Sequence, residues 1–148
     1  MLHRLNPPNA GQWNGVGGRI EPGETALENI VREVYEETGY RIRQVQFRGV
    51  LTWRGHEEPE GGLYLFTAAA PDGEPGSCDE GTLAWKPLAW VWSDPGVVSN
   101  IPLFAPQVLD GAPPRVYDFT YDGERIVSHR VYSLPVDADA LLNARRPF

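Results

Sequence analysis

Six glutamates crowd into one segment, "GGRIEPGETALENIVREVYEETGY" at positions 17–40, and they restrict how that segment can fold. Residues 26–38 have helical periodicity, and Thr25 with Glu28 three positions later makes a capping-box pattern at their start. Gly39 follows the last periodic residue, where a left-handed cap is favoured. The segment therefore predicts a helix over residues 26–38 that is entered from a glycine-rich loop.

One face of this helix is apolar. Its members recur at helical spacing and predict a stripe buried against the core, formed by Leu27, Ile30, Val31, Val34 and Thr38. At about 100° per residue, Glu33, Glu36 and Glu37 fall together on a neighbouring face. We therefore expect the acidic face at the edge of the core.

The acidic face suits a metal site. A glutamate-rich helix face is most often a solvated surface, but like charges at these spacings destabilise a helix, and only Arg32 lies nearby as a countercharge. The preceding loop contains Gly15, Gly17 and Gly18, which allow the backbone to approach a ligand and offer it a carbonyl. Such oxygen ligands favour Mg²⁺ or Mn²⁺, which bind through a few carboxylates, phosphates and water.

Composition narrows the class of partner. A chain of 148 residues suits one domain, and its net charge of −7 argues against sequence-independent binding of a nucleic-acid polymer. Divalent cations would still allow a phosphorylated small molecule to bind. No apolar run is long enough to cross a membrane, so we expect no membrane partner. Cys78 is the single cysteine, which excludes an intramolecular disulfide and makes the cytoplasm the expected compartment.

The remainder of the chain alternates between strand and helix patterns. The expected strands are the end of one at residues 1–5, then Val45–Arg54, Leu63–Ala70 and Thr82–Trp85, followed by the apolar stretch "PLAWVW". Leu103, Val108 and Leu109 indicate a second helix, and residues 117–132 a hairpin that turns at Asp122-Gly123. This mixture predicts a layered α/β or α+β domain.

The acidic segment also carries a family motif. Gly18, then five residues, Glu24, then seven residues and "REVYEETGY" at 32–40 follow the pattern G-x5-E-x7-R-E-U-x-E-E-x-G-U, where U is bulky and apolar. This segment resembles the signature of the Nudix hydrolases, with Tyr40 as a mild departure. The resemblance implies one Nudix domain over residues 1–148, an α/β/α sandwich with a central mixed sheet. It also implies hydrolysis of a nucleoside diphosphate linked to another group.

Upstream, "WNGVGGRIEPGE" is similar to the MutT-like subgroup that hydrolyses oxidised purine nucleoside triphosphates such as 8-oxo-dGTP. That similarity implies a purine nucleoside triphosphate as the substrate. The products would be a nucleoside monophosphate and pyrophosphate, in sanitation of the nucleotide pool. The partner would be this small nucleotide, and the protein a monomer or homodimer.

The resemblance assigns roles to residues. Glu33, Glu36, Glu37 and the carbonyl of Gly17 would hold Mg²⁺, with Mn²⁺ as a substitute, and Glu80 in "CDEGTLAWKPL" would be a distal ligand. The three helix glutamates would be catalytic, and the general base is left open among Glu33, Glu36 and Glu80.

Four further residues receive roles from the same resemblance. Glu24 and Arg32 would orient the loop and the helix. Asn14 would contact the base, and Trp53 would line the base pocket.

Two features depart from the subgroup. Its members usually have a whole strand before the position of Leu2, so we expect a truncated first strand. Either the fold has lost part of an edge strand, or another segment or subunit supplies that part, or the true start of the chain lies upstream. Ser99 and Asn100 occupy the place where mammalian members have paired aspartates, with Asp94 out of register.

Two other functions stay open. A Nudix-like sensor would bind a nucleotide without hydrolysing it, but such domains usually lose a motif glutamate, and all are intact here. A different hydrolase would act on another nucleoside diphosphate derivative, such as ADP-ribose.

Overall fold

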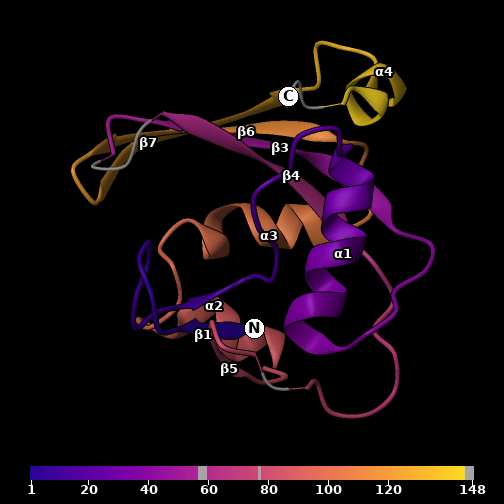
Figure 1. Cartoon of the computed structure of the whole chain (residues 1–148). Helices are drawn as coiled ribbons and strands as arrows, with labels where there is room; N and C mark the ends of the chain where they lie inside the picture. Colours follow the sequence, from indigo (N-terminus) through magenta and orange to yellow (C-terminus); the bar gives the residue numbers. More distant parts are fainter. Residues whose placement is uncertain (57–59, 77, 146–148) are drawn as a thin grey trace.

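The computed structural model describes residues 1–56, 60–76 and 78–145, and its strands form two sheets (Figure 1). The smaller sheet is antiparallel with the order β2-β1-β5, made of Trp13–Asn14, Leu2–Arg4 and Gly81–Leu83. The larger has the order β4-β3-β6-β7, made of Gly61–Thr67, Gln46–Arg54, Arg115–Asp122 and Arg125–Ser133. β3 and β6 run parallel while the outer pairs are antiparallel, so the larger sheet is mixed.

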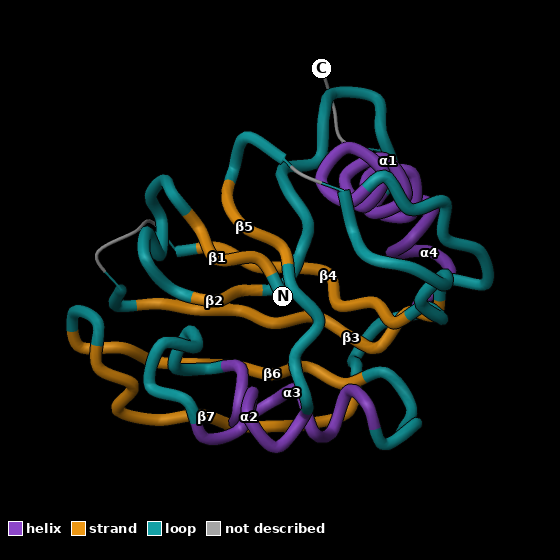
Figure 2. Tube along the Cα trace, turned by 90° about the horizontal axis from the view of Figure 1, so that it is seen from below, coloured by secondary structure: helices purple, strands orange, loops and turns teal. Residues whose placement is uncertain are grey.

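The helices lie in two pairs against the strands. In Figure 2, α1 (Ala26–Thr38) and α4 (Ala138–Asn143) lie close together at one end of the view, and α2 (Leu88–Ser93) and α3 (Ile101–Leu109) lie close together at the opposite end. Figure 1 shows α3 between the two sheets. The predicted α/β/α sandwich of mixed topology is therefore confirmed. Its strands are divided between two sheets instead of forming a single central one.

Two apolar clusters hold these layers together. The first lies where α3 packs on the larger sheet and includes Leu51, Tyr117, Phe119 and Val108. The second joins Val91 of α2 and the loop before α3 to Trp13 of β2. In addition, the Trp13 N–H donates to the Gly96 carbonyl at 2.7 Å, and the Val98 N–H donates to the Trp13 carbonyl at 3.0 Å. These bonds fix the strand that leads into the glycine loop.

The expected elements are largely confirmed, with shifted ends. β3 starts one residue later than predicted, β5 is shifted one residue earlier and shortened, and "PLAWVW" forms most of helix α2. β4 begins at Gly61 and ends at Thr67, whereas Leu63–Ala70 was predicted. Glycine in a sequence suggests a loop, but here Gly61 faces Trp53, where a Cβ would lie 2.7 Å from the indole ring. Glycine is therefore what allows this close pairing.

β1 is short but central. Two of its residues pair with β2 on one side and all three pair with β5 on the other, so the first strand is not at an edge of its sheet. Consequently Arg4 is aligned with Gly81, and the Leu5 N–H donates to the Glu80 carbonyl at 2.9 Å. This pairing connects two segments far apart in the sequence.

Helix α1 has the predicted ends. The Thr25 Oγ1 accepts from the Glu28 N–H at 3.2 Å, and a Glu28 carboxylate oxygen accepts from the Thr25 N–H at 2.8 Å. Gly39 closes the helix in the left-handed region, with φ 76°. A side-chain cap of this kind stabilises a helix by about 1 kcal/mol, which keeps the acidic residues in a defined register.

The predicted buried stripe of α1 is wrong at two positions. Val34 and Thr38 are buried, but Leu27 and Val31 are 44% and 40% exposed. Asn29 and Glu37 are buried instead because the glycine loop covers them. The Asn29 Nδ2 donates to the Arg19 carbonyl at 3.0 Å, and the Gly17 N–H donates to Glu37 at 2.9 Å. The acidic face therefore extends into the protein.

Across the described residues, 1–56, 60–76 and 78–145, no helix is long and apolar enough to span a membrane.

Candidate active site

Arg32 binds three carboxylates at once. Its Nε lies 2.9 Å from Glu24, and its Nη1 lies 2.8 Å from Glu33 and 2.9 Å from Glu36. All four side chains belong to α1 or to the loop before it. The repulsion expected among the clustered glutamates is therefore partly offset by one guanidinium.

Glu24 is the most tightly held of these partners. Its carboxylate also accepts from the Glu21 N–H at 2.9 Å and from the Asn29 Nδ2 at 3.3 Å. The hydrogen bond from Arg32, with these further donors, lowers the pKa of Glu24 to about 2. Conversely, the three carboxylates raise the pKa of Arg32, which stays charged. The predicted orienting pair is thus in direct contact.

Glu37 occupies a different environment and is only 4% exposed. One of its oxygens accepts from the Gly17 N–H at 2.9 Å. The other, Oε1, is buried and has no hydrogen-bond partner among the described residues. Burial raises the pKa of Glu37 to about 7, and the charges of Glu80 and Glu33 act in the same direction. A buried carboxylate oxygen left unpaired is costly unless something binds it.

The glycine loop is shaped around these carboxylates. Gly17 has φ 136°, a conformation that L side chains rarely adopt. A Cβ on Gly18 would collide with the Glu33 carboxylate. Gly17 is therefore favoured by its backbone conformation, and a side chain at Gly18 would displace the Glu33 carboxylate from its place against the loop.

Glu80 approaches this carboxylate cluster from the smaller sheet. It lies just before β5, its side chain is 50% exposed, and its carboxylate is 3.5 Å from the Arg4 Nη1. Its charge acts on Glu37, as noted above, so the predicted distal ligand lies on the side of the site where Glu37 is buried. Its role as a ligand stays a prediction.

The glutamates are not arranged as a ready metal cage. Within the part of the chain that the structure describes, no group of three or more His, Cys, Asp or Glu side chains could hold a metal ion as placed. Arg32 holds Glu33 and Glu36, while Gly17 holds Glu37. The donor set nevertheless fits a hard divalent cation, because it consists of carboxylates and includes the unpaired Glu37 Oε1.

The two residues predicted to bind the base lie in different sheets. Asn14 ends β2, and its Oδ1 accepts from the Gly15 N–H at 2.8 Å, so this bond does not use the Nδ2 donors. Trp53 lies near the end of β3, half-buried against the cluster that contains Leu51 and Phe119. Neither Asn14 nor Trp53 lines the cavity that lies beside α1.

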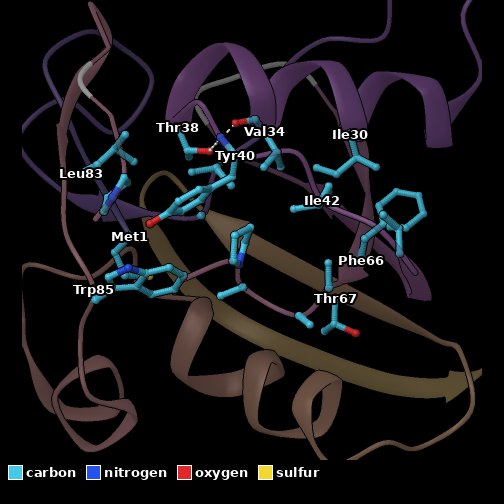
Figure 3. Close-up of a pocket in the computed structure, with 18 of the residues that line it drawn as sticks. Met1, Ile30, Val34, Thr38, Tyr40, Ile42, Phe66, Thr67, Leu83 and Trp85 are labelled. Carbon is cyan, nitrogen blue, oxygen red and sulfur yellow. Dashed lines mark hydrogen bonds between the residues drawn. The ribbon is translucent and has the colours of Figure 1, made fainter. Parts of the chain in front are cut away.

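A cavity of about 340 Å³ lies beside α1 (Figure 3). Ile30 and Val34 of α1 and Phe66 of β4 line it, and Tyr40 stacks on Trp85 with ring centroids 6.1 Å apart. Its lining is mostly apolar and includes neither Asn14 nor the motif glutamates. The cavity is therefore unsuited to hold the phosphates of a nucleotide.

Two residues that the sequence analysis did not single out belong to the site. Asn29 anchors the Arg19 carbonyl and so fixes the loop on α1. Arg4 contacts Glu80 through the pairing of β1 with β5. Asn29 could have been found as a polar residue on the side of the helix that faces the loop. Arg4 carries no local signal, because its position depends on contacts about 75 residues away along the chain.

A family model described as the NUDIX domain matches residues 1–107. The chain belongs to the Nudix family. A Bacillus subtilis protein named as an uncharacterized Nudix hydrolase, YvcI, is 31% identical over 128 residues, which cover 83% of this chain and 73% of that protein. The chain is accordingly a hydrolase that acts on pyrophosphate bonds.

Two further relatives carry functional names. The oxidized purine nucleoside triphosphate hydrolase of Danio rerio is 32% identical over 91 residues, covering 57% of this chain and 58% of that protein. The crystal structure of a mutator MutT protein from Bacillus halodurans matches with a TM-score of 0.75 and 27% identity, over 90% of this chain and 89% of the other. The MutT-like Nudix fold predicted from the sequence is therefore confirmed.

The Arg32–Glu24 pair makes the stability of the fold depend on pH. The native pKa of Glu24, about 2, lies below its ordinary value of 4.5, so the pair stabilises the fold above pH 4.5 and ceases to do so as pH falls toward 2. We expect Glu24→Gln to lower the melting temperature at neutral pH. The difference in melting temperature between variant and wild type should shrink as pH falls from 4.5 toward 2. Circular dichroism melts at a series of pH values measure this.

Glu124→Gln, in the exposed turn between β6 and β7, is the matched control and should change the melting temperature little at any pH. A difference for Glu24→Gln that stays constant from neutral pH down to about 2 would contradict the assignment.

Proposed function

We propose that this Nudix hydrolase converts a purine nucleoside triphosphate, including an oxidised one such as 8-oxo-dGTP, into the monophosphate and pyrophosphate, with Mg²⁺ as cofactor. The observation that carries the proposal is the junction of the glycine loop with α1. There Glu33, Glu36 and Glu37 lie together, and Glu37 keeps one buried oxygen unpaired. The name of the relative from Danio rerio supports the substrate class.

The metal would be held by the three helix glutamates, the Gly17 carbonyl and Glu80, with Mn²⁺ able to replace Mg²⁺. Once bound, a divalent cation supplies charge stabilisation for the phosphates and activation of a water molecule. Glu37 would contribute its unpaired Oε1 without leaving the Gly17 N–H. Glu36 is 56% exposed, so it can leave Arg32 at little cost, whereas Glu33 is 12% exposed against Gly18.

Arg32 and Glu24 would position the other residues. Glu24 fixes Arg32 through two contacts, at 2.9 and 3.0 Å, so the guanidinium stays in place when Glu36 turns toward a cation. A carboxylate must also accept the proton of the attacking water. Glu36 and Glu80 are the most exposed candidates, and we favour them over Glu33 for this role.

Base recognition would come from the strand before the glycine loop. The Asn14 Nδ2 is available to a purine edge, and Trp53 would supply an aromatic wall. Asn100 donates to the Tyr121 hydroxyl at 3.1 Å, and Ser99 is exposed. Because no aspartate pair stands at these two positions, we expect modest selection of 8-oxo-dGTP over dGTP.

We treat residues 1–148 as one catalytic domain. The family model ends at residue 107, but β6 pairs in parallel with β3 over six aligned residue pairs, so the C-terminal hairpin completes the sheet on which the site is built. The partner is a small nucleotide. With a single cysteine, a reducing compartment such as the cytoplasm suits the protein.

A substrate panel tests this proposal. The purified chain with Mg²⁺ is given dGTP, 8-oxo-dGTP, dATP, dCTP, dTTP and ADP-ribose, and release of pyrophosphate is scored against release of sugar phosphate. We expect pyrophosphate from purine triphosphates at the highest kcat/KM, and none after chelation of the metal. Preference for ADP-ribose would replace the proposed substrate class, and binding without turnover would indicate a sensor.

Loss of a helix carboxylate should abolish turnover without unfolding the protein. We expect Glu36→Gln or Glu37→Gln to lower kcat by roughly 100-fold or more, because transition-state charge stabilisation worth several kcal/mol is removed. Initial rates of pyrophosphate release measure this loss. Glu37→Gln should melt at or above the wild-type temperature without metal, because its burial as a charge and its repulsion with Glu80 and Glu33 are relieved.

Glu28→Gln, on the same helix but in its capping box, is the control, and it should keep the wild-type kcat while losing some stability. Near-wild-type turnover for both Glu36→Gln and Glu37→Gln would refute the metal site.

Asn14 can be tested by kinetics that separate binding from chemistry. We expect Asn14→Ala to raise KM for purine triphosphates more than it lowers kcat, because the base contact lies away from the reacting phosphorus. Asn143→Ala, in α4, serves as the control. Unchanged kinetics with purine and pyrimidine triphosphates alike would show that Asn14 does not read the base.

A further inference from the structure

Two arginines at one end of the larger sheet are held by neutral groups. Arg48 lies in β3, where its Nε donates to the Thr67 Oγ1 at 2.8 Å and its Nη2 donates to the Gln46 side chain. Arg115 begins β6, and its Nη1 donates to the Gln107 Oε1 of α3 at 3.0 Å. Both side chains are partly buried, and neither forms an ion pair with a carboxylate of the described residues. Two positive charges are therefore left without a direct partner in a chain whose net charge is −7.

The fold places these two side chains on the same side of the sheet. Gly49 is aligned with Arg115 in the parallel pairing of β3 with β6, so the neighbouring Arg48 stands next to β6 as well. A Cβ on Gly49 would lie 1.9 Å from the Arg115 carbonyl oxygen, so the two strands approach each other closely there. Arg115 reaches α3, and Arg48 reaches Thr67 of β4. Thr67 faces the same way as Leu65, which packs against the apolar cluster that α3 covers. Both guanidiniums therefore lie on the α3 side.

Tyr117 adds a hydroxyl to this pair. It follows Arg115 by two residues in β6, it is 1% exposed, and its ring packs against Phe104 of α3 with centroids 5.9 Å apart. Its hydroxyl hydrogen-bonds to none of the described residues. Burial raises the pKa of this hydroxyl, and the charge of Asp110 acts in the same direction. The charges of Arg115 and Arg48 act against that rise in pKa, so both guanidiniums lie close enough to Tyr117 to interact with it.

The unused donors and the charge indicate the class of ligand. The Arg48 Nη1, the Arg115 Nε and Nη2 and the Tyr117 hydroxyl donate to none of the described residues. Together they offer more N–H and O–H groups than the roughly four lone-pair sites of one carboxylate can accept. A phosphate group presents more acceptor oxygens and carries a charge of about −1.5 to −2 at neutral pH. That charge matches two guanidiniums, and arginine forks suit phosphate geometry.

We propose that Arg48, Arg115 and Tyr117 form a binding site for a phosphate group at the end of the larger sheet. None of the three is hydrogen-bonded to α1 or to the glycine loop, so this site is separate from the carboxylate cluster. The inference therefore does not rest on the proposed function. The group is carried either by inorganic phosphate or by a phosphomonoester, which present the same oxygens to the site.

Isothermal titration calorimetry of the full chain tests the site with two probes, inorganic phosphate and methyl phosphate, at constant ionic strength. EDTA is present, so that no divalent cation can bring phosphate to the carboxylate cluster. We expect saturable binding to the wild type. Arg48→Gln and Arg115→Gln should each weaken it by roughly tenfold or more, as loss of a charge-assisted hydrogen bond does. Tyr117→Phe keeps the buried ring and should weaken binding by roughly threefold, because it removes one neutral donor.

Arg125→Gln is the matched control. It also removes one positive charge, but Arg125 lies in the exposed hairpin turn and pairs with Asp122 at 3.0 Å. This variant should bind both probes as the wild type does. Melting temperatures report whether each variant is folded, and if one glutamine variant does not fold, the other and Tyr117→Phe decide.

The two probes also distinguish the source of the phosphate group. Binding of inorganic phosphate alone identifies the free ion as the ligand, whereas binding of methyl phosphate identifies a phosphomonoester. A wild-type protein that binds neither probe would overturn the proposal, as would wild-type affinity in the folded Arg48 and Arg115 variants. An equal loss in Arg125→Gln would also overturn it, because the effect would then reflect overall charge. None of these results bears on the hydrolysis of nucleotides.

Discussion

The contacts of Arg32 with Glu24, Glu33 and Glu36 are the interaction on which the rest of the site depends. Without a cation, a helix carrying this many carboxylates would be destabilised by repulsion. Arg32 supplies that cation from within the same helix, and Glu24 holds it from the loop. The helix can thus form before any metal binds, while Glu36, the most exposed of the three carboxylates, remains exchangeable.

The glycine loop and α1 form one unit because each supplies hydrogen-bond donors to polar groups of the other. The loop supplies the Gly17 N–H to the buried Glu37, and Asn29 of the helix supplies its amide to the loop carbonyl of Arg19. The absence of a side chain on Gly18 lets Glu33 lie against the backbone. In this arrangement the buried Glu37 Oε1 has no hydrogen-bond partner among the described residues. This unpaired oxygen favours a metal-binding function over a purely structural one.

The sheets bring in residues that the helix cannot supply. β1 pairs with β2 and β5, so Arg4, Asn14 and Glu80 all approach the loop from the smaller sheet. The larger sheet carries Trp53 and is held to the helices through Phe119 and Val108. In the proposed function, the local motif would carry out the phosphate chemistry and the distant strands would contribute recognition.

The sequence by itself determined the helix, its caps, the glycine loop and the family, because all of these signals lie in the continuous segment of residues 17–40. It also predicted the hairpin, whose Asp122-Gly123 turn is local. Only the tertiary structure decided that Glu37 and Asn29 are buried while Leu27 and Val31 are exposed, since the loop that covers the helix is not part of the helical period. The tertiary structure likewise decided that β4 begins at Gly61 and that Arg4 contacts Glu80, because pairing partners distant in the chain set both features.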